Sequence, residues 1–327
     1  MRIGINGFGR IGRAVMRRAL QTDLDIVAVN DITDAATLAH LLQYDSTYGP
    51  LDMTVTASAG ALQIDSTSVA VHACADPADI DWRAHDVDLV IDSTGRFRTR
   101  EALAAHLKAG AGKVLLSAPG KGLDATIVPG VNDAAYDPAR HEIVSLASCT
   151  TNCVAPMVKV LHERFGLVRG FMTTIHAYTG DQVLLDAPHK DLRRARSAAV
   201  NIVPTTTGAA RMVGQVLPEL NGRLDGVAIR VPVEDGSITD LSAQLARPVT
   251  AQEVNDAFAT AAEEELRGIL RYSTAPLVSR DIIGNPASCV FDSALTQASE
   301  DLVKVFGWYD NEWGYANRLV DMARRMA

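Results

Sequence analysis

A cysteine and a histidine are the two side chains of this sequence that could together form and break a covalent bond to a substrate. Cys149 lies in the hexapeptide SCTTNC at 148–153, between an apolar strand pattern and the apolar segment 154–161. Backbone dipoles at such a strand-to-helix junction favour the thiolate, which is the nucleophilic form of the side chain. His176 ends a second strand pattern, and a histidine is the usual base for a thiol. The pattern is compatible with a Cys–His nucleophile.

Each of these residues also has an ordinary structural interpretation. From local sequence alone, a cysteine such as Cys149 is structural about twice as often as it is catalytic. His176 could be a solvated loop histidine, one of 8 in the chain, and spacing alone does not show that the two side chains meet. We expect structural roles for Cys74, Cys153 and Cys289. No histidine or acidic residue accompanies the cysteines at metal-ligand spacing, so no metal site is expected.

A glycine-rich loop indicates dinucleotide binding. The hexapeptide GFGRIG at 7–12 fits G-x-G-x-x-G, follows a strand pattern over 2–6 and opens a helix pattern at Arg10. Glycines at these positions let the backbone approach a pyrophosphate, which the N–H groups of the helix N-terminus bind. Asp31, nineteen residues beyond Gly12, would accept hydrogen bonds from the adenosine ribose and repel a 2′-phosphate. A tight turn with a surface aspartate is the alternative, and this context favours NAD.

The elements around these motifs predict two domains. The first half alternates strand and helix patterns, with strands at 26–30, 88–92, 113–117 and 143–146, which indicates a doubly wound, Rossmann-type α/β sheet. The segment 54–71, around Ala59-Gly60, should form an antiparallel insertion. The helix that starts at Arg10 should expose its arginines at 13, 17 and 18 to solvent.

The second half has the pattern of an α+β domain with a mainly antiparallel sheet. Strands are expected at 170–175, 227–231, 238–245 and 302–306, and a last helix over 313–326. Thr250 and Glu253 form a capping box for a helix that runs to about Leu266. Pro156 either kinks the helix after Cys149 or marks its true first turn. We expect an NAD-binding domain over 1–147, with a C-terminal helix at 312–327 that packs back on it, and a catalytic domain over 148–311.

Composition and charge exclude several classes of protein. The 327 residues carry a formal net charge of −8, which makes nucleic-acid binding through phosphates unfavourable. No apolar run approaches the ~18 residues of a membrane span, and the first residues show no signal-peptide pattern. Four cysteines are too few for a disulfide framework at this length. We expect a cytoplasmic protein without a nucleic-acid or membrane partner.

Several segments together resemble the glyceraldehyde-3-phosphate dehydrogenase family, of the phosphorylating bacterial type. In chain order they are NGFGRIGR at 6–13, ND at 30–31, SCTTNC at 148–153, DLRRAR at 191–196, PTTTGAA at 204–210 and WYDNE at 308–312. The resemblance implies NAD-dependent oxidation of D-glyceraldehyde 3-phosphate with inorganic phosphate to 1,3-bisphosphoglycerate, in glycolysis or gluconeogenesis. It also implies a homotetramer in which the loop at about 178–201 reaches a neighbour's cofactor cleft.

The same resemblance implies roles for individual residues. Cys149 would be the nucleophile that forms a hemithioacetal and then a thioester, and His176 would remove the thiol proton. The implied cofactor contacts are Gly7, Gly9, Arg10, Ile11, Asp31, Ser117 and Asn311. The implied substrate-phosphate site contains Thr179 and Arg230, and the implied site for the attacking phosphate contains Ser148, Thr150, Thr207 and Gly208. Arg194 would lie between or near both.

Three departures from the family pattern leave alternatives open. Ala187-Pro188 stands where NAD-using members often have Leu-Pro and NADP-using plastid members have Ala-Ser, so some use of NADP beside NAD is compatible with the sequence. The acidic segment VEDG at 233–236 and the basic segment STGRFR at 93–98 also differ. Erythrose-4-phosphate dehydrogenase is an alternative activity. A non-catalytic thiol redox sensor or interaction protein is an alternative of another class, although a sensor needs only the reactive thiol.

Overall fold

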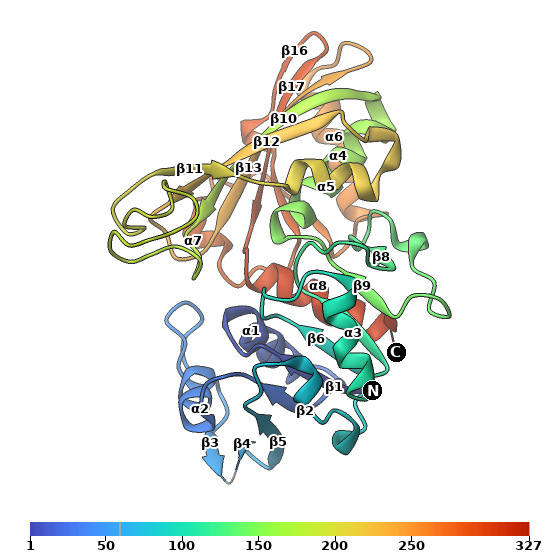
Figure 1. Cartoon of the computed structure of the whole chain (residues 1–327). Coiled ribbons are helices and arrows are strands. Elements are labelled where there is room, and N and C mark those ends of the chain that lie inside the picture. The colour runs from blue at the N-terminus through green and yellow to red at the C-terminus, as the bar shows by residue number, and fades with distance from the viewer. Residues whose placement is uncertain (59, 327) are drawn as a thin grey trace. The chain divides into compact units, whose positions relative to one another are not determined.

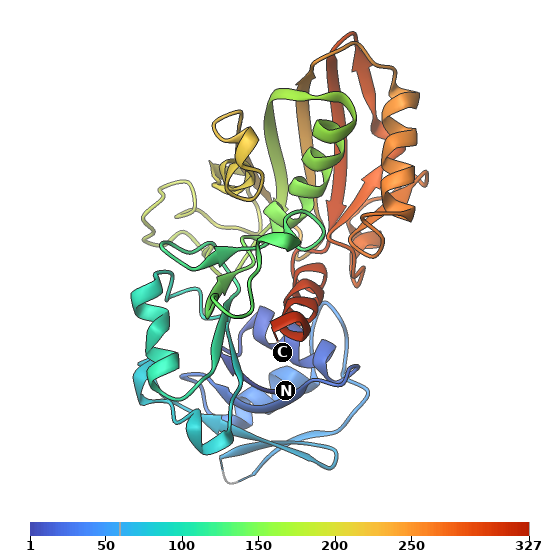
Figure 2. The same ribbon diagram turned by 90° about the vertical axis from the view of Figure 1, so that its right-hand side faces the viewer.

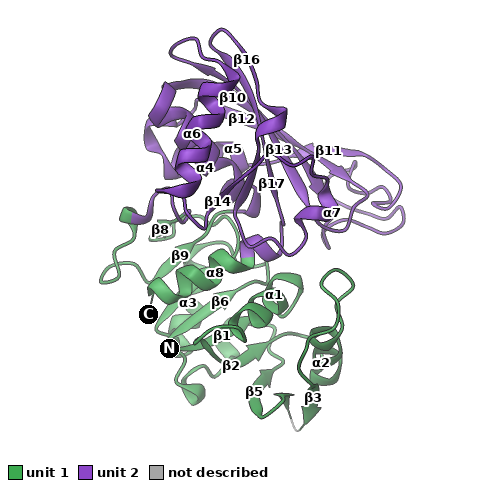
Figure 3. Cartoon of the chain, turned by 180° about the vertical axis from the view of Figure 1, so that it is seen from behind, with its two compact units in different colours: residues 1–127, 134–147, 316–327 green, residues 128–133, 148–315 purple. Residues whose placement is uncertain are grey.

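The computed structural model describes residues 1–58 and 60–326, which form two compact units (Figure 3). The first unit consists of residues 1–127, 134–147 and the C-terminal residues from 316 onward, and the second of residues 128–133 and 148–315. Ala59 and Ala327 lie outside the described residues, and with them part of the turn expected around Ala59-Gly60 and the last residue of the segment 312–327.

The first unit is built on a nine-stranded sheet, drawn in blue to green in Figure 1. Its strands are β1 (Arg2–Asn6), β2 (Asp25–Asn30), β3 (Val55–Ser58), β4 (Ala61–Ile64), β5 (Thr67–His72), β6 (Leu89–Asp92), β7 (Lys113–Leu116), β8 (Ala125–Thr126) and β9 (Ile143–Ser145). Its helices are α1 (Arg10–Ala19), α2 (Ala35–Gln43) and α3 (Arg100–Lys108), together with the part of α8 (Trp313–Met326) that begins at residue 316.

The strand order β3-β4-β5-β2-β1-β6-β7-β9-β8 confirms the doubly wound sheet. Within the part of this sheet that the structure describes, β3–β4 and β4–β5 are the antiparallel pairs, so the insertion expected at 54–71 is also confirmed. The remaining pairs are parallel. Because the carboxyl ends of parallel strands meet at one edge, the neighbours β2, β1 and β6 bring Asn30, Asn6 and Asp92 to the same edge of the sheet.

Arg17 on α1 differs from its expected place in solvent, so that prediction is wrong. The side chain is only 6% exposed and donates to the carbonyl oxygens of Leu42 (2.8 Å), Gln43 (3.4 Å) and Gly49 (3.0 Å). Leu42 and Gln43 end α2, where the last carbonyls have no intrahelical donor. A guanidinium carries five N–H donors and can satisfy several of them at once, which explains its burial.

The second unit contains an eight-stranded sheet of order β11-β12-β10-β13-β17-β15-β14, with β16 paired to β17. Its strands are β10 (Leu167–Ala177), β11 (Val203–Thr206), β12 (Leu224–Val231), β13 (Ser237–Leu245), β14 (Leu270–Ser273), β15 (Cys289–Asp292), β16 (Gln297–Ser299) and β17 (Leu302–Tyr309). Its helices are α4 (Cys149–Phe165), α5 (Ala209–Val216), α6 (Ala251–Glu263) and the short α7 (Ser279–Ile282). The pairs β10–β12 and β14–β15 are parallel and the others antiparallel, which confirms the expected sheet type.

Helix α4 packs against β10, β13 and β17 and also contacts α6, as the turned view in Figure 2 shows. The helix begins at Cys149 and runs through Pro156, so the alternative that Pro156 marks the first turn is wrong. The capping box of α6 is confirmed: Thr250 Oγ1 accepts from the Glu253 N–H (3.1 Å), and Glu253 Oε2 accepts from the Thr250 N–H (2.8 Å). Among the described residues, no helix is both long and apolar enough to cross a membrane.

Candidate active site

The sulfur of Cys149 is placed by the first turn of α4. Ser148 is the N-cap residue, and its Oγ accepts a hydrogen bond from the Thr151 N–H at 3.0 Å. A serine N-cap satisfies a donor that the helix itself leaves open, which explains why α4 starts at this point. Cys149 is therefore the first helical residue, and its half-buried side chain lies at the positive end of the helix dipole.

His176 faces this sulfur from the end of β10. Its Nε2 lies 3.6 Å from Cys149 Sγ, and its Nδ1 lies 2.7 Å from the carbonyl oxygen of Ala177. A carbonyl oxygen only accepts, so the ring proton lies on Nδ1 and the lone pair of Nε2 faces the thiol. The two residues come from α4 and β10 of the same unit, and this contact is the pair that the sequence could not demonstrate.

Arg230 stands beside His176 because β10 and β12 pair in parallel with these two residues in register. Its Nη1 lies 3.2 Å from His176 Nδ1 and donates to the Ala177 carbonyl oxygen (3.0 Å) and to Thr179 Oγ1 (3.2 Å). Since Nδ1 already carries a proton, the guanidinium acts on the imidazole through its charge. One side chain thus joins the imidazole, a fixed carbonyl and Thr179.

Burial and this positive charge decide the protonation of the pair. Burial, and after it the positive charge of Arg230, together lower the pKa of His176 to about 3. Burial raises the pKa of the Cys149 thiol to about 11, against the opposing effects of the Arg230 charge and of a hydrogen bond from Thr150. The helix dipole and the charge of Arg230 favour the thiolate, but desolvation outweighs them, so a thiol and a neutral imidazole are the favoured forms at neutral pH.

The predicted anion-binding residues fall into neighbouring groups. Ser148 and Thr150 flank the cysteine, and Thr151 Oγ1 contacts the carbonyl oxygen of Ala209 (3.5 Å), which brings the start of α4 to the start of α5. Gly208 is the N-cap residue of α5. Thr207 Oγ1 accepts from the Ala209 N–H (3.2 Å), so Thr207 and Gly208 belong to this group. Thr179 belongs instead to the group around Arg230.

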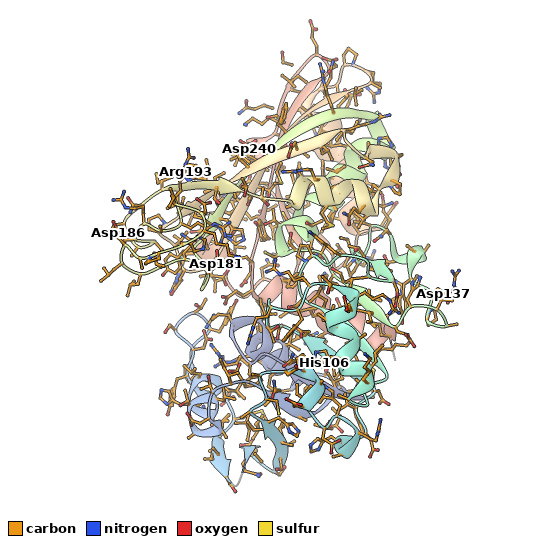
Figure 4. The ribbon with its side chains drawn as sticks, viewed as in Figure 1. His106, Asp137, Asp181, Asp186, Arg193 and Asp240 are labelled. Atoms are coloured by element: carbon orange, nitrogen blue, oxygen red, sulfur yellow. The ribbon has the colours of Figure 1, made fainter. Side chains whose placement is uncertain are left out.

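Arg194 is held within its own loop. Its Nη1 pairs with Asp181 Oδ2 (2.5 Å), and its Nε donates to Thr205 Oγ1 (3.0 Å). Figure 4 shows Asp181 in this loop together with Asp186 and Arg193. The charge of Arg194 acts on both His176 and Arg230, so the guanidinium lies close enough to join their electrostatic field.

The glycine loop opens onto a pocket of about 220 Å³ within the first unit, lined by Asn6, Gly7, Gly9, Asn30, Asp31, Ile32, Cys74, Ala75, Ser93, Thr94, Arg96 and Phe97. Gly7 has φ +89°, and a Cβ there would lie 2.7 Å from the Thr94 nitrogen. By contrast, a Cβ at Gly9 would meet nothing within 4 Å, so the loop surface is open at that residue. A close backbone approach and a carboxylate at the pocket fit a dinucleotide with its ribose at Asp31.

The predicted cofactor residues do not all line this pocket. Gly7, Gly9 and Asp31 do, and Asp31 also accepts from the Phe8 N–H at 2.7 Å. Arg10 pairs with Asp45, and the Ser117 N–H donates to the carbonyl oxygen of Asp92 at 2.9 Å. Ile11 is half-buried on α1. Asn311 is buried in the second unit, where its side chain accepts from Ser237 Oγ at 2.6 Å.

Comparisons with known proteins agree with this geometry. Residues 1–100 match the family model "Glyceraldehyde 3-phosphate dehydrogenase, NAD binding domain", and residues 148–311 match the model of the C-terminal domain of the same family. A relative named glyceraldehyde-3-phosphate dehydrogenase 2 from Streptomyces avermitilis is 57% identical over 325 residues, with 98% of this chain and 97% of the relative covered. A glyceraldehyde-3-phosphate dehydrogenase from Geobacillus stearothermophilus is 56% identical over 329 residues, with 100% and 98% covered.

The chain belongs to the glyceraldehyde-3-phosphate dehydrogenase family. The resemblance on which the sequence analysis relied is thereby confirmed over the whole chain, and so are the fold class and the NAD-binding domain.

Two features of this family member escaped the sequence analysis. Tyr309 Oη lies 2.8 Å from Thr150 Oγ1 and 2.8 Å from Thr174 Oγ1, so a buried phenol ties the start of α4 to β10 beneath the Cys–His pair. Burial and the nearby Cys149 raise the pKa of Tyr309, which keeps it a neutral hydrogen-bonding group. The position of Tyr309 inside the WYDNE segment was the available signal.

The second feature is the pocket wall formed by Ser93, Thr94, Arg96 and Phe97. These residues follow β6 directly, at the edge where β1 and β6 diverge to opposite halves of the sheet. That switch point is where open α/β sheets bind ligands, so the strand order could have indicated them. The basic segment at 93–98 thereby acquires a place in the structure.

Proposed function

We propose that this chain is an NAD-dependent, phosphorylating glyceraldehyde-3-phosphate dehydrogenase that forms 1,3-bisphosphoglycerate. The single observation that carries the proposal is the contact between Cys149 Sγ and the unprotonated Nε2 of His176 at 3.6 Å. A nucleophile and a base in contact, with the base oriented by a third group, is the arrangement that covalent catalysis needs. Here the third group is the Ala177 carbonyl, which holds the Nδ1 proton.

The chemistry of these residues follows in three steps. Cys149 adds to the aldehyde carbon while its proton leaves to His176 Nε2 and passes to the carbonyl oxygen, which gives a hemithioacetal. His176 next removes the hydroxyl proton as hydride leaves the carbon, so that a thioester remains on Cys149. Phosphate oxygen then attacks the thioester, the C–S bond breaks, and the acyl phosphate forms while the released sulfur takes back a proton from His176 Nε2. NAD, when bound, accepts the hydride.

Two anion sites complete the proposal. Arg230 and Thr179 are suited to the substrate phosphate, because a guanidinium and a hydroxyl offer several donors at one place. Ser148, Thr150, Thr207 and Gly208 are suited to the attacking phosphate near the start of α5, with Arg194 serving either site.

We assign NAD as the cofactor of the first unit, with Gly7, Gly9 and Asp31 in contact with it and Arg10, Ile11, Ser117 and Asn311 as further contacts. Asp31 disfavours the 2′-phosphate of NADP, since an unneutralised carboxylate beside a phosphate is costly. Secondary use of NADP remains compatible with Ala187.

The homotetramer and the cytoplasmic location are parts of the same proposal. The loop at 178–201 supports an oligomer because it exposes large apolar side chains, among them Leu184 (75%), Leu192 (81%) and Val200 (77%). Analytical ultracentrifugation of the full chain, which measures its molar mass in solution, would test the homotetramer. All four cysteines are free thiols, as a reducing compartment requires.

The decisive experiment is a steady-state assay of NADH formation by the full chain. Glyceraldehyde 3-phosphate with inorganic phosphate should give high turnover, and omission of phosphate should stop it after about one equivalent per site, because the thioester accumulates. Erythrose 4-phosphate under the same conditions should react with a far lower kcat/KM. Equal rates with and without phosphate, or a preference for erythrose 4-phosphate, would reject the proposal, and absence of any turnover would favour the redox-sensor class.

A further inference from the structure

Buried polar side chains form a connected series under the dinucleotide pocket of the first unit. His106 on α3 (Figure 4) and Trp82 are both fully buried, and Trp82 Nε1 donates to His106 Nδ1 at 3.0 Å. An indole nitrogen only donates, so Nδ1 is the acceptor and the imidazole proton lies on Nε2. Nε2 lies 3.2 Å from Asp92 Oδ2, to which it donates. Both neighbours of His106 therefore select the same tautomer: Trp82 donates to Nδ1, and Asp92 accepts the proton of Nε2.

Asp92 carries this orientation to the pocket wall. Its Oδ2 also accepts from Asn6 Nδ2 at 2.9 Å. Its Oδ1 accepts from the Thr94 N–H (3.1 Å) and from Thr94 Oγ1 (2.8 Å). Asn6 and Thr94 line the pocket, whereas His106 and Asp92 do not. Asp92 thus holds the ends of β1 and β6 in one geometry from behind the wall.

The series continues to β2 through amide groups whose directions are determined. A carboxylate only accepts, so Asn6 presents its Nδ2 to Asp92 and its Oδ1 to Asn30, whose Nδ2 donates at 2.8 Å. Asn30 pairs with the backbone of Cys74 in both directions, at 3.0 Å and 2.9 Å. Asn30 and Cys74 line the same pocket. Loss of the Nε2–H donor of His106 would therefore be transmitted to three segments of the wall.

We propose that His106 and Asp92 are positioning residues of the dinucleotide pocket, with the Nε2–H of His106 holding the Asp92 carboxylate in the orientation that fixes Asn6 and Thr94. The proposal rests on the proposed binding of NAD in this pocket. Loss of the Nε2–H leaves Asp92 Oδ2, which is fully buried, with one remaining donor among the described residues, Asn6 Nδ2. Such an oxygen lowers its free energy by turning toward other hydrogen-bond donors. This turn displaces the wall residues that are bound to the carboxylate.

Two substitutions of His106 separate its two hydrogen bonds. His106→Asn keeps an acceptor near the position of Nδ1 for Trp82 and removes the donor to Asp92. His106→Gln keeps a side-chain N–H near the position of Nε2. Trp82→Phe is the matched control: it removes the buried hydrogen bond at His106 Nδ1, whereas the Asp92 carboxylate, which only accepts, still keeps the imidazole proton on Nε2. Calorimetric titration of each full-length variant with NAD measures Kd, and thermal unfolding measures Tm.

We expect His106→Asn to weaken NAD binding about tenfold, consistent with loss of a hydrogen bond to a charged group. His106→Gln should stay within about threefold of the parent. Trp82→Phe should lower Tm and leave Kd within about twofold. In turnover, His106→Asn should raise the KM for NAD and leave kcat at saturating NAD nearly unchanged. A purely structural role would lower Tm without this split.

The proposal is overturned if His106→Asn binds NAD like the parent, or if Trp82→Phe loses affinity as much as His106→Asn. Should His106→Asn fail to fold, Asp92→Asn serves instead, since its single amide oxygen cannot serve both Asn6 and Thr94, and the same tenfold loss is expected. Failure of the parent chain itself to bind NAD would reject the proposed function, and that result is distinguishable because it precedes any variant.

Discussion

Arg230 and His176 bind the same carbonyl oxygen of Ala177, Arg230 through Nη1 at 3.0 Å and His176 through Nδ1 at 2.7 Å. A permanent positive charge therefore lies 3.2 Å from the imidazole. This arrangement keeps the base neutral and its Nε2 available for the thiol proton, at the cost of making an imidazolium harder to form.

Replacement of Arg230 by Gln should raise the pKa of His176. Burial and then the charge of Arg230 hold that pKa at about 3, so removal of the charge moves it upward while burial keeps it below the ordinary value of 6.5. NMR titration of the His176 ring in a Cys149→Ala background measures the effect without the thiol. Arg194→Gln is the control and should raise the pKa of His176 less, because the charge of Arg194 has the smaller effect on that pKa. An unchanged pKa in Arg230→Gln would contradict the electrostatic account.

Replacement of Cys149 by Ser should reduce the rate of aldehyde oxidation by about 10³-fold or more, because a hydroxyl is a far weaker nucleophile than a thiol beside the same base. NAD affinity should not change, since Cys149 is not among the proposed cofactor contacts. Cys153→Ser is the matched control one helical turn further on. Its hydroxyl can replace the thiol that donates to the Gly307 carbonyl oxygen, so activity should persist. Retained turnover in Cys149→Ser would exclude the thioester route.

Replacement of Asp31 by Asn should shift the nucleotide preference toward NADP by about tenfold or more, because the charge that opposes a 2′-phosphate is removed. The amide oxygen can still accept from the Phe8 N–H, which keeps the glycine loop in place. Asp34→Asn is the control: it removes the same charge three residues further on, at the N-cap of α2. The ratio of kcat/KM for NADP and NAD is the measurement, and equal ratios in the two variants would refute the role of Asp31.

The sequence predicted those parts of the site whose geometry is local. The glycine loop, Asp31 and the capping box of α6 follow from residue spacing within one or two elements. The SCTTNC segment placed Cys149 near a strand-to-helix junction, but Pro156 left the first turn of α4 open until the structure showed it. The contact between Cys149 and His176 depends on how α4 packs on β10, which no spacing reports. The sequence also could not predict the protonation of the Cys149 thiol. Local dipoles favour the thiolate, whereas desolvation, which depends on the packing of the whole site, opposes it. The prediction that Arg17 is exposed to solvent was wrong for the same reason, because the carbonyl oxygen of Leu42 that it binds lies on a different helix.

The acidic segment at 233–236 predicts a specific dependence of stability on pH. Asp235 and Asp310 are both buried and interact side chain to side chain, and two carboxyl groups can share a hydrogen bond only while one of them carries a proton. Burial raises the pKa of Asp310 above its ordinary value. A carboxyl whose pKa is higher in the folded chain stabilises the fold at low pH, and that stabilisation is lost as the pH rises through the folded-state pKa.

Replacement of Asp235 by Asn should therefore stabilise the chain more at pH 8 than at pH 5. The amide donates to Asp310 at every pH, and its oxygen can still accept from the N–H groups of Gly236 (2.8 Å) and Asn311 (3.3 Å). Thermal unfolding at both pH values is the measurement. Asp281→Asn on α7 is the control, because the Asp281 carboxylate is exposed to solvent and accepts a hydrogen bond from the Val278 N–H. A gain in Tm that is the same at pH 5 and pH 8 would disprove the shared proton.

Replacement of Arg17 by Met should lower the free energy of unfolding by about 3 kcal/mol, because it leaves the carbonyl oxygens at the end of α2 without their donor. Met fills much of the same volume, so the loss reports the hydrogen bonds and little of the packing. Arg17→Lys should fall between Met and the parent, since one ammonium cannot serve Leu42 and Gly49 as a forked guanidinium does.

Arg18→Met is the control on the same helix. The side-chain hydrogen bond that the described residues give Arg18 is the one to Gln21 Oε1 at 3.3 Å, within the same helix end, so its loss should cost about 0.5 kcal/mol or less. Urea unfolding of the full-length variants gives these values, and an Arg17→Met variant as stable as Arg18→Met would show that the buried guanidinium contributes nothing to the end of α2.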